Sequence, residues 1–260
     1  MTEKKQSISA IREIFAAASE TELPALYLEY EEDSRAGVQN LIQKYKKQEE
    51  ALKKERERTE QMKIYEHKYE DLGWICGIDE VGRGPLAGPV VAGAVILPPD
   101  CRILYLNDSK KLTERRRELL YDEIMEKAVA VGIGVVSQEM IDEINILQAT
   151  YEAMRQAVGK LSVRPDVLLN DAVTIPGLLQ EQIPIIKGDA KSLSIAAASV
   201  VAKVTRDRMM EALDEKYPAY HFASNKGYGS AAHMEALREY GPCPLHRRTF
   251  IRNICGEQSS

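Results

Sequence analysis

The chain has 260 residues and a formal net charge of −5, and 44% of its residues are hydrophobic. This composition is ordinary for a globular protein, and the acidic balance argues against indiscriminate binding to nucleic acid while permitting a local basic groove. No apolar run approaches the roughly 18 residues that span a bilayer, the N-terminus lacks a signal-peptide core, and the four cysteines have no metal-type spacing. We therefore expect a cytoplasmic protein with reduced thiols and no membrane partner.

The first 70 residues differ from the rest and predict a helical N-terminal extension. Apolar residues recur at helical spacing over 8–15 and 38–45. Residues 46–58 are almost entirely charged, and the pairs Glu49/Lys53 and Glu50/Lys54 have the favourable order for a solvated helix. A helical linker or spacer is the simplest interpretation of residues 46–58, and an accessory contact with nucleic acid or protein is the alternative.

Residues 71–260 have the pattern of a compact α/β domain that ends in a helical part. The predicted strands are 74–80, 90–97, 131–137, 166–171 and 183–186. The predicted helices are 113–128, which Thr113 would cap, 138–159, 193–217 and 230–240. Three early strands followed by alternating strands and helices predict a mixed sheet with helices against its faces.

The segment from Gly77 to Val90 carries the strongest functional signal. Asp79 and Glu80 end an apolar strand there, and a Gly-Arg-Gly turn follows at 82–84. Carboxylates are costly in a core and useful around a metal, while an arginine between two glycines suits close approach to a phosphate. The segment predicts a metal-dependent site for phosphate chemistry; the alternative is a hairpin with two solvated acids at its rim. A dinucleotide fingerprint is excluded because a strand-like run, not a helix, follows the turn.

Two further acids stand where strands would deliver them. Asp171 ends the apolar run 167–170, and Asp189 precedes a helix rich in small residues. Taken singly, Asp171 also suits the start of a turn and Asp189 suits a helix N-cap. Adjacent strand residues point to opposite faces, so Asp79 and Glu80 can share a site only where the strand ends or twists, which Gly82 permits.

Six short blocks in a fixed order resemble the ribonuclease HII family, the type 2 ribonucleases H. They are 77–85 (GIDEVGRGP), 107–112 (NDSKKL), 169–171 (LND), 187–192 (KGDAKS), 226–229 (KGYG) and 245–250 (LHRRTF). The resemblance covers residues 72–254, and the ordered set is far more specific than any block alone. It implies an RNase H-like fold, in which helices flank a mixed β-sheet.

The resemblance implies that a catalytic, metal-binding cluster is formed by Asp79, Glu80, Asp171 and Asp189. Four carboxylates in one pocket repel each other, and Mg²⁺ or Mn²⁺ relieves that repulsion. Two such ions about 4 Å apart would activate a water molecule and stabilise the leaving 3′ oxygen of a phosphodiester.

The resemblance also implies substrate contacts. The Gly82-Arg83-Gly84 turn would read the ribonucleotide at an RNA–DNA junction, because an unobstructed backbone can hydrogen-bond a 2′-hydroxyl. Tyr228 would pack on the sugar that follows the cleavage point. Further substrate-binding residues would be Ser109, Lys110 and Lys191, the two lysines as phosphate contacts. Asn225 departs from the family, since many members carry His at this position.

The implied activity is an endonuclease that cuts the RNA strand of RNA–DNA hybrids, including single ribonucleotides embedded in duplex DNA. Cleavage on the 5′ side of a ribonucleotide would leave a 3′-hydroxyl and a 5′-phosphate. We expect a monomer. Whether the protein binds a replication protein is not decided by the sequence. The alternatives are type 3 specificity, which Arg83 disfavours, a hybrid-binding module without catalysis, which the complete set of acids disfavours, and a metal phosphatase.

Overall fold

The chain forms two compact units that divide between Arg58 and Thr59 in a computed structural model, which describes residues 6–255 and their side chains through 254. The first unit contains α1 (Ile8–Ala17), α2 (Leu23–Glu29) and most of α3 (Ala36–Gln61). Phe15 is fully buried at its centre and packs against the rings of Tyr27, Tyr30 and Tyr45. The helical character predicted for the N-terminal extension is therefore confirmed. No helix within residues 6–255 is long and apolar enough to cross a membrane.

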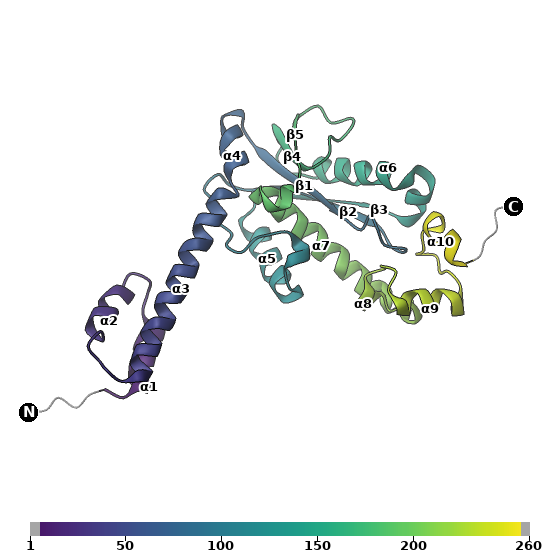
Figure 1. Cartoon of the computed structure of the whole chain (residues 1–260). Coiled ribbons are helices and arrows are strands. Elements are labelled where there is room, and N and C mark those ends of the chain that lie inside the picture. Colours follow the sequence, from purple (N-terminus) through teal and green to yellow (C-terminus); the bar gives the residue numbers. More distant parts are fainter. Residues whose placement is uncertain (1–5, 256–260) are drawn as a thin grey trace, which may run out of the picture. The chain divides into compact units, whose positions relative to one another are not determined.

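The second unit combines a five-stranded sheet with helices (Figure 1). Its strands are β1 (Ile75–Val81), β2 (Val90–Ile96), β3 (Ala130–Val136), β4 (Val167–Asp171) and β5 (Glu181–Ile185). Its α-helices are α4 (Ile64–Tyr69), α5 (Glu114–Lys127), α6 (Gln138–Gly159), α7 (Leu193–Asp214), α8 (Phe222–Asn225), α9 (Ala231–Tyr240) and α10 (Arg248–Cys255). Short 3-10 turns are η1 (Glu70–Leu72), η2 (Ser109–Lys111), η3 (Gly188–Ala190) and η4 (Pro218–Tyr220).

The sheet is mixed, as the sequence predicts. Its strand order is β3-β2-β1-β4-β5, in which β2 pairs antiparallel with β1 and β3, while β4 pairs parallel with β1 and β5. Every predicted strand and helix is present, and the Thr113 side chain caps α5 by accepting a hydrogen bond from the Arg116 amide. The predicted helix 138–159 contains a break at Asn145, whose φ of 67° is not helical.

Glycines on both faces of the sheet let helices approach its backbone closely. A Cβ atom added to Gly77 would lie 2.1 Å from the Ser194 carbonyl carbon on α7, and one added to Gly134 would lie 1.8 Å from the Ala153 oxygen on α6. Helices α7 and α6 therefore cover opposite faces, and residues with side chains would force the layers apart.

Replacing Gly134 by Ala should lower the free energy of unfolding by about 2 to 3 kcal/mol, because the backbone of α6 has to move away from β3. The matched control is Gly159→Ala, where an added Cβ would meet nothing within 4 Å. That control should be neutral or stabilising by up to about 1 kcal/mol. Denaturant unfolding of both variants measures the difference, and equal midpoints would contradict the close packing of α6 on the sheet.

Helix α4 belongs to the second unit and is bonded to the start of α7. The Glu66 Oε1 atom accepts hydrogen bonds from the Ser192 hydroxyl (2.6 Å) and the Ser194 amide (2.9 Å). The Leu193 amide donates to the carbonyl of Met62 at 2.9 Å. A glutamate at a helix N-terminus satisfies amides that have no partner within the helix.

The C-terminal helical part contains two buried histidines whose ionisation should make stability depend on pH. Burial lowers the pKa of His246 to about 4, and burial also lowers the pKa of His233. His246 takes up its proton at a higher pH in the unfolded state than in the folded state. The free energy of unfolding should therefore decrease as pH falls from about 6.5 to about 4, by on the order of 3 kcal/mol in total.

The measurement is the free energy of unfolding against pH for the wild type and for His246→Asn. The difference between the two curves reports His246, because contributions that both proteins share cancel. Among these are the raised carboxyl pKa values of Asp79, Glu80 and Asp189, which act in the opposite direction. Parallel curves between pH 6.5 and 4 would show that His246 takes up its proton equally well in both states.

Candidate active site

A cleft of about 850 Å³ lies where β1 ends and the Gly-Arg-Gly turn begins. Its lining comprises Asp79, Glu80, Val81, Gly82, Arg83, Gly84, Ser109, Lys110, Ile146, Ser199, Lys203, Tyr228 and Phe250. The structure thus brings together two of the predicted acids, the whole glycine turn, and the predicted substrate contacts Ser109, Lys110 and Tyr228.

Asp79 and Glu80 reach the cleft from opposite faces of the sheet. Alternation along β1 puts Asp79 on the face of Gly77, which is covered by α7, and its carboxylate is hydrogen-bonded to Ser199 of that helix. Glu80 shares the face of Ile78, which belongs to the core cluster under α6. β1 ends at Val81, directly after the pair, and Gly82 follows with a φ of +89°. The end of the strand lets both carboxyl groups border one cleft.

The environment of these two acids disfavours their charged forms. Burial raises the pKa of Asp79 well above its ordinary value, and repulsion by Glu80 and Asp171 adds to the effect. Burial also raises the pKa of Glu80, against the opposing effect of Arg83, whose Nη1 atom lies 3.2 Å from Glu80 Oε1. Carboxyl groups held in this way are typical of sites that bind a cation or move a proton.

Asp171 lies between the pair Asp79 and Glu80 and the fourth acid, Asp189, in the chain of electrostatic interactions. It ends β4, and its Oδ1 atom accepts a hydrogen bond of 2.7 Å from the amide of Gly188, the first residue of η3. Asp189 follows in η3, where burial raises its pKa and repulsion by Asp108 and Asp171 contributes. The N-cap of α7 is Ser192, so the alternative that Asp189 is a helix N-cap is wrong. Asp171 and Asp189 are not among the residues that line the cleft; Asp171 repels both Asp79 and Glu80, and Asp189 is repelled by Asp171.

The four acids offer the oxygen donors that a divalent ion prefers. Among the described side chains, no group of three or more His, Cys, Asp or Glu residues is arranged closely enough to coordinate a metal ion. The donor set nevertheless fits Mg²⁺ or Mn²⁺, because carboxylate oxygens are the ligands of these hard cations and their mutual repulsion favours a positive charge among them. The residues present are therefore compatible with the implied metal.

Two fully buried arginines donate to backbone carbonyls, Arg247 to those of the glycine turn and Arg206 to those of the segments beside it. Arg247 donates to the carbonyls of Gly82 (2.5 Å), Arg83 (2.9 Å) and Gly88 (3.0 Å). Arg206 donates to those of Ala87, Pro89 and Lys226 at 3.2, 2.9 and 2.8 Å. Burial lowers the pKa of both guanidinium groups, that of Arg247 to about 9. With so many carbonyls tied to these side chains, the turn has one well-defined backbone path.

Tyr228 stands beside the glycine turn and is itself held by a second turn. A Cβ atom added to Gly84 would lie 3.9 Å from Tyr228 Cε1, and the tyrosine side chain is 41% exposed. Asn225 forms this second turn, because its Oδ1 atom accepts from the Gly227 amide (2.8 Å) while its Nδ2 atom donates to the Tyr220 carbonyl (2.7 Å). The amide thus gives Asn225 a structural role of its own.

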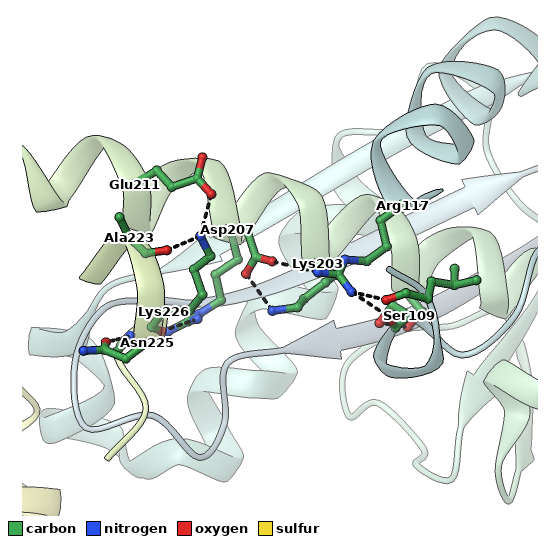
Figure 2. A network of polar contacts seen from close by, with 12 residues as sticks. Ser109, Arg117, Lys203, Asp207, Glu211, Ala223, Asn225 and Lys226 are labelled. Atoms are coloured by element: carbon green, nitrogen blue, oxygen red, sulfur yellow. Dashed lines mark hydrogen bonds and ion pairs between the residues drawn. The ribbon is translucent and has the colours of Figure 1, made fainter. Parts of the chain in front are cut away.

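A series of polar contacts along α7 includes residues that line the cleft (Figure 2). Arg117 Nη1 donates to the carbonyl of Ser109 at 3.1 Å, and the Ser109 hydroxyl shares a hydrogen bond of 3.0 Å with Ser199. Asp207 pairs with Lys203 at 2.6 Å and with Arg117 at 3.7 Å. Ser109 is consequently buried and fixed rather than mobile.

Lys203 is a lining residue that sequence reasoning missed. It follows Ser199 by four residues on α7, so helical spacing puts both on the face toward the cleft. Lys110 is exposed and also lines the cleft, whereas Lys191 is exposed but lies outside the lining. Of the three lysines, Lys110 and Lys203 are therefore better placed than Lys191 to meet a phosphate in this cleft.

Comparison with known proteins gives two family matches. The family model of Ribonuclease HII matches residues 76–253, and that of the Ribonuclease HII N-terminal domain matches residues 7–70. The Ribonuclease HII of Lachnoclostridium phytofermentans is 64% identical over 225 residues, which are 86% of this chain and 89% of that relative. The Ribonuclease HII of Enterococcus faecalis is 50% identical over 248 residues, which are 95% of this chain and 96% of that relative.

Solved structures agree with these matches. The ribonuclease H2 of Pyrococcus horikoshii OT3 has a TM-score of 0.60 and 31% identity, and the match covers 70% of this chain and 97% of that one. RNase HII of Archaeoglobus fulgidus, solved in a complex with PCNA, has a TM-score of 0.56 and 27% identity, covering 72% and 98%. The predicted RNase H-like fold is confirmed. The chain belongs to the ribonuclease HII family, divalent-metal-dependent endoribonucleases that hydrolyse the RNA strand of RNA–DNA hybrids.

Proposed function

We propose that this chain also cuts duplex DNA at single embedded ribonucleotides, on the 5′ side, leaving a 3′-hydroxyl and a 5′-phosphate. One observation carries the proposal: the fixed glycine turn, Tyr228 and the acidic residues Asp79 and Glu80 border the same cleft. A site that recognises a single ribose beside the phosphate to be cut can act on a substrate with only one ribonucleotide. The Ribonuclease HII of Lachnoclostridium phytofermentans, 64% identical over 86% of this chain, supports type 2 rather than type 3 activity.

In this proposal the acids hold divalent ions and the turn selects the sugar. Asp79, Glu80, Asp171 and Asp189 would hold two ions of Mg²⁺ or Mn²⁺, which when bound activate water and stabilise the leaving oxygen. Gly82, Arg83 and Gly84 present backbone groups to the 2′-hydroxyl, which is the group that distinguishes RNA from DNA. Tyr228 packs on the sugar that follows the cleavage point. Ser109 and Lys110 position the phosphate strand, and Lys191 contacts the strand outside the cleft.

The test is cleavage of a DNA duplex that carries one ribonucleotide, with Mg²⁺, Mn²⁺ or EDTA present. A metal-dependent nick on the 5′ side of the ribonucleotide, which EDTA abolishes, is the expected result. An all-DNA duplex of the same sequence is the control. Cutting of a long hybrid without that nick would establish type 3 specificity instead, and binding of either substrate without cleavage would establish a binding module.

The proposal also concerns partners, oligomeric state and location. A replication protein as partner is supported by the Archaeoglobus fulgidus relative, which was solved in complex with PCNA. A monomer, a cytoplasmic location and the division of work between residues 1–70 and 71–260 stay predictions. Sedimentation of the purified chain with and without a hybrid duplex measures the first of these.

A further inference from the structure

We infer that His233 and His246 are positioning residues for Tyr228, joined in a buried relay that fixes the tyrosine beside the glycine turn. The inference rests on the role proposed for Tyr228. It gives a function to His246, which stands in the block 245–250 next to Arg247, the residue that fixes the glycine turn.

The relay consists of three hydrogen bonds, two of them fully buried and the one to Tyr228 partly buried. The Cys243 amide lies 3.0 Å from His246 Nδ1, the two Nε2 atoms of His246 and His233 lie 2.9 Å apart, and His233 Nδ1 lies 2.8 Å from the carbonyl oxygen of Tyr228. His233 is 0% exposed and His246 is 2% exposed. No water is needed to complete this path.

Only one arrangement of protons satisfies all three contacts. The Tyr228 carbonyl can only accept, so His233 Nδ1 must carry a hydrogen and donate it. In a neutral ring His233 Nε2 then accepts from His246 Nε2, which leaves His246 Nδ1 free to accept from the Cys243 amide. The opposite tautomers would place two acceptors 2.8 Å apart at Tyr228. Burial, which lowers the pKa of both imidazoles, keeps the pair neutral.

The backbone around His246 is bonded to residues 86–88, which follow the glycine turn. His246 forms an isolated β-bridge with Ala87, the Gly88 amide donates to the Leu245 carbonyl at 2.9 Å, and the Arg247 amide donates to the Leu86 carbonyl at 2.8 Å. The Leu86 amide in turn donates to the Gly227 carbonyl at 2.8 Å, next to Tyr228. The C-terminal segment therefore fixes both the turn that would read the ribose and the tyrosine that would pack on its neighbour.

Three variants separate this role from a general contribution to stability. His233→Leu removes the donor to Tyr228 and should lower kcat/KM on the single-ribonucleotide duplex about tenfold, since misplacement of a positioning group is costly. His233→Asn keeps an N–H at the position of Nδ1 and should stay within about threefold of the wild type. His67→Gln, a histidine exposed on α4, is the matched control and should leave kcat/KM unchanged.

The deciding readout is a double-mutant cycle with Tyr228→Ala. If His233 acts through Tyr228, His233→Leu should lower kcat/KM less than twofold in the Tyr228→Ala background. An equal loss in both backgrounds, or equal losses for the Leu and Asn variants, would overturn the relay while leaving the proposed role of Tyr228 intact. Full activity of Tyr228→Ala alone would refute that proposed role and the relay together. Thermal unfolding of each variant verifies that folded protein is compared.

Discussion

Replacing Asp79 by Asn should abolish turnover while making the free protein more stable. The carboxylate is 7% exposed, is repelled by Glu80 and Asp171, and has a pKa well above its ordinary value. A neutral amide removes that repulsion and keeps an oxygen that can accept from the Glu80 amide, as Asp79 Oδ1 does at 2.8 Å. Without divalent ions we expect the free energy of unfolding to rise by about 1 kcal/mol, as is common when a residue selected for function is neutralised.

The same change should lower kcat at least about 1,000-fold, because a preorganised charge at the reacting centre is lost. Binding of a hybrid duplex should change little, since the contacts with the strand stay in place. The exposed Asp100 offers the matched control, and Asp100→Asn should leave both kcat and stability unchanged. Single-turnover cleavage and thermal unfolding in EDTA measure the two effects. An Asp79→Asn enzyme with normal turnover, contamination excluded, would show that the cleft is not the catalytic site.

The second large effect is expected for Arg247→Lys, which keeps a cationic side chain but removes the planar guanidinium group with its several N–H donors. Arg247 donates to four carbonyls of the segment 82–89, those of Gly82, Arg83, Gly88 and Pro89. A lysine cannot reproduce this geometry, and each buried carbonyl left without a donor costs about 1 kcal/mol or more. We expect a loss of about 2 to 3 kcal/mol in the free energy of unfolding.

The Arg247→Lys variant should also lose catalytic efficiency, in addition to stability. A glycine turn released from Arg247 can sample other backbone paths, so kcat/KM on the single-ribonucleotide duplex should fall about 10- to 100-fold at a temperature where the variant is folded. Arg248→Lys is the control, because that side chain is exposed and one residue away. Equal activity of the two variants would mean that the turn keeps its path without the guanidinium group.

Much of the fold follows from local sequence signals. The glycines that permit close helix packing, the apolar runs and the caps at Thr113 and Ser230 are all local features, and the sequence-predicted strands and helices are present. The break at Asn145 was not predicted, because the apolar spacing of 138–159 continues through it. Asn145 supplies an Oδ1 atom that accepts from the amides of Leu147 and Gln148, so it starts a second helical stretch and Ile146 lines the cleft.

The candidate site was only partly accessible from the sequence. The acids and the glycine turn form recognisable blocks, whereas Arg206 and Arg247 are distant in sequence and their contacts depend on the tertiary fold. Two arginines in polar segments are ordinarily surface residues. Their complete burial, and the pairing of His233 with His246, appear only when α7, the glycine turn and the C-terminal segment are assembled.

The contact between α4 and α7 changes what a shortened chain would report. Glu66 accepts from Ser192 and Ser194, and Ser192 is the residue that caps α7 three positions after Asp189. A chain that starts at residue 71 lacks this acceptor and Met62 as well, so the loop that carries Asp189 loses its anchor. A chain that starts at Thr59 keeps both. A loss of cleavage seen only in the shorter form would therefore come from displacement of the segment that carries Asp189. The contribution of helices α1 to α3 to cleavage can be measured only in a chain that keeps α4.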